Sequence, residues 1–135
     1  LVKGEGRILV MDDDLLLQDV YQRLLRQLGY TPVIVSGGEE ALEAYRRARE
    51  RGEPFAALIM DLTIPGGLGG KETIKRLLAM DPNAVAIIAS GYSNDPVMAR
   101  YAEYGFKDVV RKPFSAQRLS EVLSKVLRGR SPAQR

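Results

Sequence analysis

Short apolar runs alternate with amphipathic segments along most of the chain. The first run, Arg7 to Met11 (RILVM), is too short for a helix and is rich in branched residues, as a buried strand is. The apolar positions that follow are spaced three and four apart and stop before Gly29: Leu17, Val20, Leu24 and Leu28. This spacing predicts a helix with one buried stripe and a glycine stop.

The same alternation recurs four more times. Further strands are predicted over 31–35, 56–60, 84–89 and 108–111, and further helices over 38–51, 71–80, 96–104 and from 116 onward. Pro96 suits the first turn of its helix behind Asp95, and Ser115 can cap the last helix. Five strands, each followed by a helix, predict an α/β fold: a doubly wound, five-stranded parallel sheet with helices on both faces.

Length and composition fit one packed domain. The chain has 135 residues, of which 45% are hydrophobic and 27% charged, so a core needs no disulfide or metal staple. We expect a domain over 7–128, preceded by an N-terminal extension (1–6) and followed by a flexible C-terminal tail (129–135, GRSPAQR). The first residue is Leu and no signal peptide follows, which suggests a piece of a longer polypeptide.

Missing residue types exclude several kinds of chemistry. The chain has no Cys and no His, which rules out disulfides, thiolate nucleophiles, imidazole bases and Cys/His zinc sites. A cysteine-free chain without an apolar stretch of about 20 residues is expected to be cytoplasmic and not to insert in a membrane. The net charge is +3, and the arginine-rich run 46–51 is interleaved with glutamate, so we expect a solvated helix face and no direct nucleic-acid contact.

Polar side chains stand where the predicted strands end. Asp12 and Asp13 follow the first strand, Asp61 the third, Ser90 the fourth and Lys112 the fifth. In a doubly wound fold these ends meet near the point where the strand order reverses. Like charges repel strongly in a partly buried site, so a carboxylate cluster there needs a cation, and oxygen ligands favour Mg²⁺.

A metal, a carboxylate and a lysine suit phosphoryl transfer, in which positioning and charge neutralisation dominate. Asp61 could attack phosphorus directly, because a carboxylate is ionised at neutral pH and needs no base. Mg²⁺ and Lys112 would hold the phosphoryl oxygens, and Ser90 would donate a hydrogen bond to them.

The chain resembles the receiver domains of two-component response regulators, which have a flavodoxin-like fold. The resemblance rests on ILVMDDD, IMDLTIPGGLGG, IIASGYS and VVRKPF, in that order on the expected elements. It implies that Asp61 is the phosphoacceptor, and that Asp12, Asp13 and Asp61 bind Mg²⁺ together with the backbone carbonyl of Thr63. It further implies that Ser90 is the hydroxyl switch and that Lys112 is the lysine that contacts the phosphoryl group.

Two stretches, TIPGGLGGKE and SGYSNDPVMARYAEYGF, look most like receivers at the C-terminus of hybrid sensor histidine kinases. The implied partner is a sensor histidine kinase, in the same polypeptide or in a separate one, or a histidine phosphotransfer protein. The isolated domain would then be a phosphoacceptor with at most slow self-dephosphorylation.

The chain departs from the family pattern beside the switch. The position three before Lys112, often an aromatic residue that swings inward, is Val109, which puts aromatic-coupled switching in doubt. The positions that tune phosphoryl lifetime in receivers correspond to Thr63 and Tyr92. Neither orients water strongly, and Tyr92 is bulky enough to shield the acyl phosphate, so slow hydrolysis is expected.

Two other readings stay open at this point. Asp12 and Asp14 form a DxD motif after a strand, which resembles haloacid-dehalogenase-type phosphatases with Asp12 as nucleophile and Asp14 as acid. That reading leaves Asp61 without a role and lacks an acidic pair after Lys112; Asp14 also suits a helix start. A degenerate receiver that only docks partners would be favoured by loss of a site residue, and none is lost.

Overall fold

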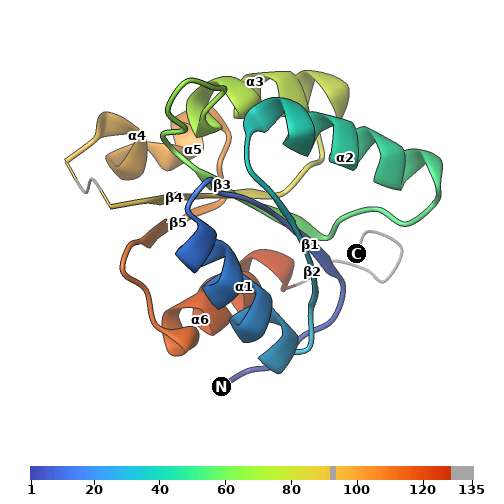
Figure 1. Ribbon diagram of the computed structural model, residues 1–135, viewed down its shortest axis with the longest axis vertical. Coiled ribbons are helices and arrows are strands. Elements are labelled where there is room, and N and C mark those ends of the chain that lie inside the picture. Colours follow the sequence, from blue (N-terminus) through green and yellow to red (C-terminus); the bar gives the residue numbers. More distant parts are fainter. Residues whose placement is uncertain (92–93, 129–135) are drawn as a thin grey trace.

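The computed structural model describes residues 1–91 and 94–128, which form one sheet covered by helices (Figure 1). The strands are β1 (Arg7–Met11), β2 (Thr31–Val35), β3 (Ala57–Asp61), β4 (Ala86–Ser90) and β5 (Asp108–Arg111). The helices are α1 (Leu15–Gln27), α2 (Gly38–Glu50), α3 (Gly70–Met80), α4 (Pro96–Ala99), α5 (Tyr101–Tyr104) and α6 (Ala116–Leu127).

All strand pairs are parallel and the order across the sheet is β2-β1-β3-β4-β5. One core cluster lies on the face covered by α2, α3, α4 and α5, and the other on the face covered by α1 and α6 (Figure 1). The predicted doubly wound parallel sheet is therefore confirmed. The order reverses between β1 and β3, which places the ends of these two strands side by side.

Local signals at the helix ends behave as the sequence predicts. The Asp14 side chain accepts hydrogen bonds from the backbone of Leu16 and Leu17, and the Ser115 hydroxyl accepts one from Arg118, so each caps a helix. Gly29 ends the turn after α1 with a φ of +97°, which a side chain rarely tolerates.

The buried stripe of α1 is rotated relative to the prediction. Val20 is 40% exposed, whereas Tyr21 and Leu25 are fully buried and Leu28 is 1% exposed. Successive helical residues are about 100° apart, so a stripe centred on Tyr21 and Leu25 turns Val20 outward. The prediction that Val20 belongs to the buried stripe was wrong.

The predicted helix over 96–104 is two short helices. Arg100 leaves the helical conformation, with φ −115° and ψ 35°, and a second turn begins at Tyr101. Tyr101 and Tyr104 then pack, partly buried, against the cluster that contains Val97 and Met98. The prediction of one continuous helix was therefore wrong.

Two predicted strands begin too early. Ala56 and Ala84 precede β3 and β4, and the Ala84 N–H bonds to the Asp81 carbonyl in the turn after α3. β3 instead runs one residue further, to Asp61, so the carboxylate at its end is still part of the sheet.

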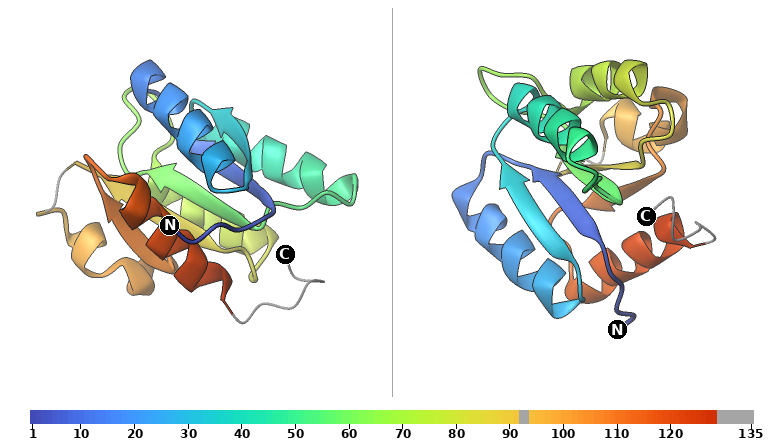
Figure 2. Two further views of the ribbon diagram at one scale, coloured as in Figure 1. Left: turned by 90° about the horizontal axis from the view of Figure 1, so that it is seen from below. Right: turned by 90° about the vertical axis from the view of Figure 1, so that its right-hand side faces the viewer.

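The N-terminal residues run beside α6 (Figure 2). The Val2 N–H donates to the Ser120 hydroxyl at 3.0 Å, and that hydroxyl donates to the Val2 carbonyl at 2.8 Å. The Gly4 N–H donates to the Leu28 carbonyl at the end of α1. The expected tail, 129–135, lies outside the described residues. None of the helices in the described part has the length and apolarity that crossing a bilayer requires.

Candidate functional site

Four elements bring their polar ends to one place. Asp12 and Asp13 directly follow β1, Asp61 ends β3, Ser90 ends β4, and Lys112 directly follows β5. They line a cleft of about 640 Å³ together with Asp14, Leu17, Thr63, Pro65 and Gly91. The structure therefore places every sequence-predicted site residue that it describes in one cleft, except Val109.

The carboxylates are close enough to share one ion. Asp12, Asp13 and Asp61 each offer an oxygen, and these oxygens lie within 4.8 Å of one another. Asp12 is buried, Asp61 is partly buried and Asp13 is exposed, so the group opens toward solvent at Asp13. Three carboxylates converging on one point fit a hard divalent cation that keeps part of its water shell. The residues present therefore fit Mg²⁺.

Lys112 bridges two of the three carboxylates. Its Nζ lies 2.7 Å from Asp12 Oδ2 and 3.2 Å from Asp61 Oδ1. Burial alone would lower the pKa of Lys112, but the hydrogen bonds and charges of Asp12 and Asp61 outweigh it and raise that pKa. Lys112 is thus a fixed cation beside Asp61.

Asp61 is electrostatically strained. Burial raises its pKa, and the neighbouring charge of Asp12 raises it further, against the opposing effects of Lys112 and of the Thr63 N–H, which hydrogen-bonds to it. The negative charge on Asp61 is therefore unfavourable in the folded protein, and a cation or a covalent change that neutralises it would relieve the strain.

Glycines let the loop after β3 approach Asp61 closely. A Cβ on Gly69 would lie 2.4 Å from the Leu62 carbonyl oxygen, and one on Gly70 would lie 2.9 Å from the Asp61 carbonyl oxygen. The glycine-rich run after Asp61 therefore brings α3 directly under the strand end that carries the carboxylate.

Sequence reasoning missed Gln18, a residue of α1 whose side chain contacts the backbone of the site residue Asp12. Its Nε2 donates to the Asp12 backbone carbonyl at 2.7 Å and to the Ser36 hydroxyl at 3.2 Å. The signal in the sequence is only a polar residue one turn after the acidic run, which is also what a solvated helix position looks like.

Tyr21 was also missed: its buried hydroxyl has no hydrogen-bond partner within the described residues, and burial and the charges of Asp12 and Asp61 raise its pKa.

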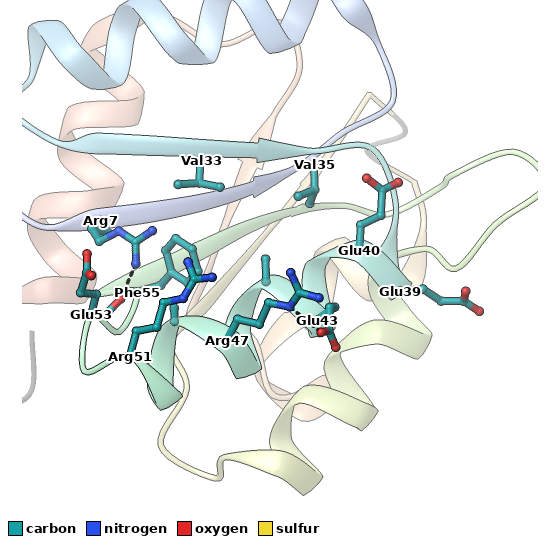
Figure 3. A pocket seen from close by; sticks show the side chains of 12 residues that line it. Arg7, Val33, Val35, Glu39, Glu40, Glu43, Arg47, Arg51, Glu53 and Phe55 are labelled. Atoms are coloured by element: carbon teal, nitrogen blue, oxygen red, sulfur yellow. Dashed lines mark hydrogen bonds and ion pairs between the residues drawn. The ribbon is translucent and has the colours of Figure 1, made fainter.

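A second hollow lies away from the acidic cleft. A groove of about 620 Å³ runs between β2 and α2, with Val33, Val35 and Phe55 on its floor and charged side chains around it (Figure 3). None of its lining residues lines the acidic cleft. The predicted solvated face of α2 is confirmed in this region, because Arg46 and Arg47 pair with Glu43 on the helix surface.

Comparison with known families decides what this arrangement is. The model of the response regulator receiver domain matches residues 8–124. The chain belongs to the response regulator receiver domain family. This receiver domain is 29% identical over 121 residues to the chemotaxis protein CheY of Thermotoga maritima, covering 89% of the chain and 96% of CheY. It is 28% identical to the transcriptional regulatory protein FixJ of Bradyrhizobium diazoefficiens, covering 96% of the chain but 60% of FixJ.

Solved structures agree on the fold. A putative response regulator from Chloroflexus aurantiacus matches with a TM-score of 0.80 and 25% identity over 92% of this chain and 98% of that one. The receiver domain of a sensor histidine kinase from Pseudomonas aeruginosa, crystallised with a magnesium ion coordinated in its active site cleft, matches with a TM-score of 0.79 and 24% identity, again over 92% and 98%. The flavodoxin-like receiver fold is confirmed.

Family membership also separates the readings that the sequence left open. As a receiver, the chain has a role for Asp61, which the phosphatase reading left unused. Asp14, the acid in that reading, instead caps α1 through the backbone of Leu16 and Leu17. The resemblance to haloacid-dehalogenase-type phosphatases therefore does not hold.

Val109, the predicted switch residue on β5, lies away from the cleft. Val109 is 5% exposed and packs in the cluster covered by α2, α3 and α4, on the sheet face opposite α1. Its neighbour Val110 packs in the other cluster. Tyr92 lies outside the described residues.

Replacing Asp61 by Asn is expected to stabilise the metal-free receiver at neutral pH. Because its pKa is raised, the folded state binds a proton there more tightly than the unfolded chain, so ionisation costs folding free energy. This cost is absent below about pH 3, grows as pH rises to the folded pKa, and is constant above it. Thermal unfolding with a chelator should show Asp61→Asn a few degrees above wild type at pH 7, with the gap closing at acidic pH.

Asp14→Asn is the matched control for this measurement. It removes a carboxylate from the same cleft but keeps a good helix cap, so its unfolding midpoint should follow wild type. An Asp61→Asn protein less stable than wild type at pH 7 without metal would show that the acidic cluster is not strained.

Proposed function

We propose that Asp61 accepts a phosphoryl group from a phosphohistidine of a partner, with Mg²⁺ held by Asp12, Asp13, Asp61 and the Thr63 carbonyl. The observation that carries the proposal is the convergence of three carboxylates on one point, with Lys112 fixed between Asp12 and Asp61. Burial raises the pKa of Asp61, and this residue ends β3, the central strand of the sheet. It is therefore the group whose charge the transfer relieves.

In the proposed step an Asp61 oxygen attacks phosphorus in line. A P–O bond forms to Asp61 while the P–N bond to the histidine breaks, and its electron pair returns to the imidazole nitrogen of the partner. Bound Mg²⁺ supplies charge neutralisation for the phosphoryl oxygens. Lys112, already 3.2 Å from Asp61, lies where it can donate to one of those oxygens. The Thr63 N–H keeps the attacking carboxylate oriented.

Ser90 and Lys112 are proposed to transmit the modification. Ser90 is buried at the end of β4 in the same cleft, and Lys112 follows β5, so both strands can respond to a phosphoryl group on Asp61. We expect Ser90 to move toward Asp61 and the segment from Gly91 through Tyr104 to Val109 to rearrange. A large aromatic swing is not part of this response, because Val109 has no ring.

Receiver domains in general interact with histidine kinases and phosphotransfer proteins. In this chain, Leu15 and Leu16 on the first turn of α1 are 78% and 81% exposed, and Val20 is 40% exposed. These exposed apolar side chains belong to the helix that begins directly after Asp14 of the cleft, which fits a partner that must bring its phosphohistidine to Asp61. We propose that the partner is a sensor histidine kinase, either in the same polypeptide or in a separate one, or a histidine phosphotransfer protein.

The donor chemistry favours a cytoplasmic location, because the phosphoryl group of a histidine kinase comes from ATP.

The acyl phosphate is proposed to decay slowly when water attacks phosphorus and the Asp61 carboxylate leaves. Thr63 offers neither acid nor base to orient that water, and we propose that Tyr92 shields the approach. Faster hydrolysis in Tyr92→Ala would support this shielding, and an unchanged rate would exclude it.

Magnesium is expected to bind at millimolar or lower concentration and to raise thermal stability, because it relieves repulsion among the three carboxylates. Asp13→Asn should weaken this binding about tenfold while leaving the fold intact, since Asp13 is exposed. Calorimetric titration with MgCl₂ gives the Mg²⁺ dissociation constant of the wild-type domain and of Asp13→Asn. If about 10 mM Mg²⁺ neither shifts the unfolding midpoint of the wild-type domain nor produces heat of binding, the proposed metal site is refuted.

Partner binding and phosphorylation, each measured with and without Mg²⁺, test the docking-only alternative. A receiver that merely docks partners needs neither metal nor an acceptor, so it would bind its partner with equal affinity with or without Mg²⁺ and would gain no phosphate from a small phosphodonor. The proposed function requires Mg²⁺-dependent gain of one phosphate.

A further inference from the structure

We propose that Gln18 is a positioning residue for the metal site. It would hold the turn that carries Asp12 and Asp13 in the geometry that Mg²⁺ requires, and it would make the site select Mg²⁺ over Ca²⁺. The inference rests on the proposed function, because it concerns how the same carboxylates bind their ion. Its evidence is the double hydrogen bond of the Gln18 amide.

Gln18 ties together two strand ends. One amide nitrogen donates to the Asp12 carbonyl, directly after β1, and to the Ser36 hydroxyl, directly after β2. Gln18 is the fourth residue of α1, at the end of its first turn, so its side chain reaches back over the acidic turn that precedes the helix. The amide thereby links α1 to the ends of two neighbouring strands.

Asp12 is held at every polar atom. Its N–H donates to the Val35 carbonyl at 3.0 Å, Oδ1 accepts the Asp14 N–H at 2.9 Å, and Oδ2 accepts from Lys112 at 2.7 Å. The fourth group, the backbone carbonyl, accepts from Gln18. Asp12 is 1% exposed, so water cannot readily replace a lost partner. Without Gln18, the turn must shift for this carbonyl to find another donor.

A shift of this turn matters more for one ion than for another. Mg²⁺ demands near-ideal octahedral geometry at short distances, whereas Ca²⁺ accepts irregular and longer coordination. Asp12 and Asp13 are adjacent in the chain, so moving the Asp12 backbone displaces both carboxylates relative to Asp61. Loss of positioning therefore predicts a selective loss of Mg²⁺ affinity, which a general loss of stability does not.

The test compares Gln18→Met with Gln22→Met. Methionine keeps the length of the side chain and removes its donors, and Gln22 lies one turn later on α1 and is half-buried like Gln18, which makes it a matched control. Calorimetric titrations with MgCl₂ and with CaCl₂ give the two dissociation constants. Both are run at a temperature well below the unfolding midpoint of each variant. Ser36→Ala removes one of the two acceptors of Gln18 and keeps the other, the Asp12 carbonyl. It therefore shows which of the two hydrogen bonds matters for metal binding.

In Gln18→Met the Mg²⁺ dissociation constant is expected to rise about tenfold, as when other groups that orient metal ligands are removed, and the Ca²⁺ constant less than about twofold. Gln22→Met and Ser36→Ala should match wild type. An unchanged Mg²⁺ constant in Gln18→Met, or equal weakening of both ions, would overturn the inference while leaving the metal site intact. A wild-type protein that binds no Mg²⁺ would overturn the proposed function and this inference together.

Discussion

Asp61→Asn is expected to abolish phosphorylation completely. Incubated with acetyl phosphate and Mg²⁺, the wild-type domain should gain one phosphate that hydroxylamine removes, as an acyl phosphate requires. The Asn amide cannot act as the nucleophile, and the remaining carboxylate closest to Lys112, Asp12, is buried and held at both oxygens. Intact-mass measurement before and after hydroxylamine treatment gives the stoichiometry directly.

Asp14→Asn is the matched control here also. It removes a carboxylate that lines the cleft but whose role is to cap α1, so it should be phosphorylated like wild type. An Asp61→Asn protein that still gains one hydroxylamine-sensitive phosphate would refute the assignment of Asp61.

Lys112→Met is expected to leave phosphorylation possible and to remove the response to it. Asp61 still supplies the oxygen that forms the bond, but the link between the phosphoryl group and β5 is lost. Hydrogen exchange in residues 94–104 and 108–111 should change on phosphorylation in wild type and stay unchanged in the variant. Lys107→Met, an exposed lysine just before β5, should respond like wild type.

The same substitution should also destabilise the metal-free protein. It leaves Asp12, 1% exposed, beside Asp61 without their shared cation, and removing one partner of a buried ion pair costs about 3 kcal/mol. Added Mg²⁺ should recover part of this loss, because it neutralises the same carboxylates. Denaturant unfolding with and without Mg²⁺ measures both effects, and a variant as stable as wild type would show that Lys112 does not balance this cluster.

The order of elements was predictable because each strand is a short, mainly apolar run that ends in a polar residue or is followed directly by one. In a parallel sheet such ends must lie at one edge, so RILVM before Asp12 and ALIM before Asp61 were enough to predict the acidic cluster. The helix caps at Asp14 and Ser115 were predictable for a similar reason, since capping is a local hydrogen bond.

Features that depend on tertiary contacts were not predictable in this way. Val20 points outward because of the way α1 packs on the sheet. The spacing of apolar residues along α1 fits two neighbouring buried faces equally well, so the sequence alone could not choose between them. The break in the helix at Arg100 depends on how Tyr101 and Tyr104 pack against the core. Gln18 acquires its proposed role only because the packing of α1 on the sheet brings its amide within reach of the Asp12 carbonyl.

The site of the phosphoryl group is the most direct test of the account. Borohydride reduction of the phosphorylated domain converts an aspartyl phosphate to homoserine, which peptide sequencing by mass spectrometry locates. The account predicts homoserine at position 61 in wild type, and only when Mg²⁺ was present during phosphorylation. Homoserine at position 12 or 13, or phosphate retained on Ser90 with Asp61 unmodified, would contradict it.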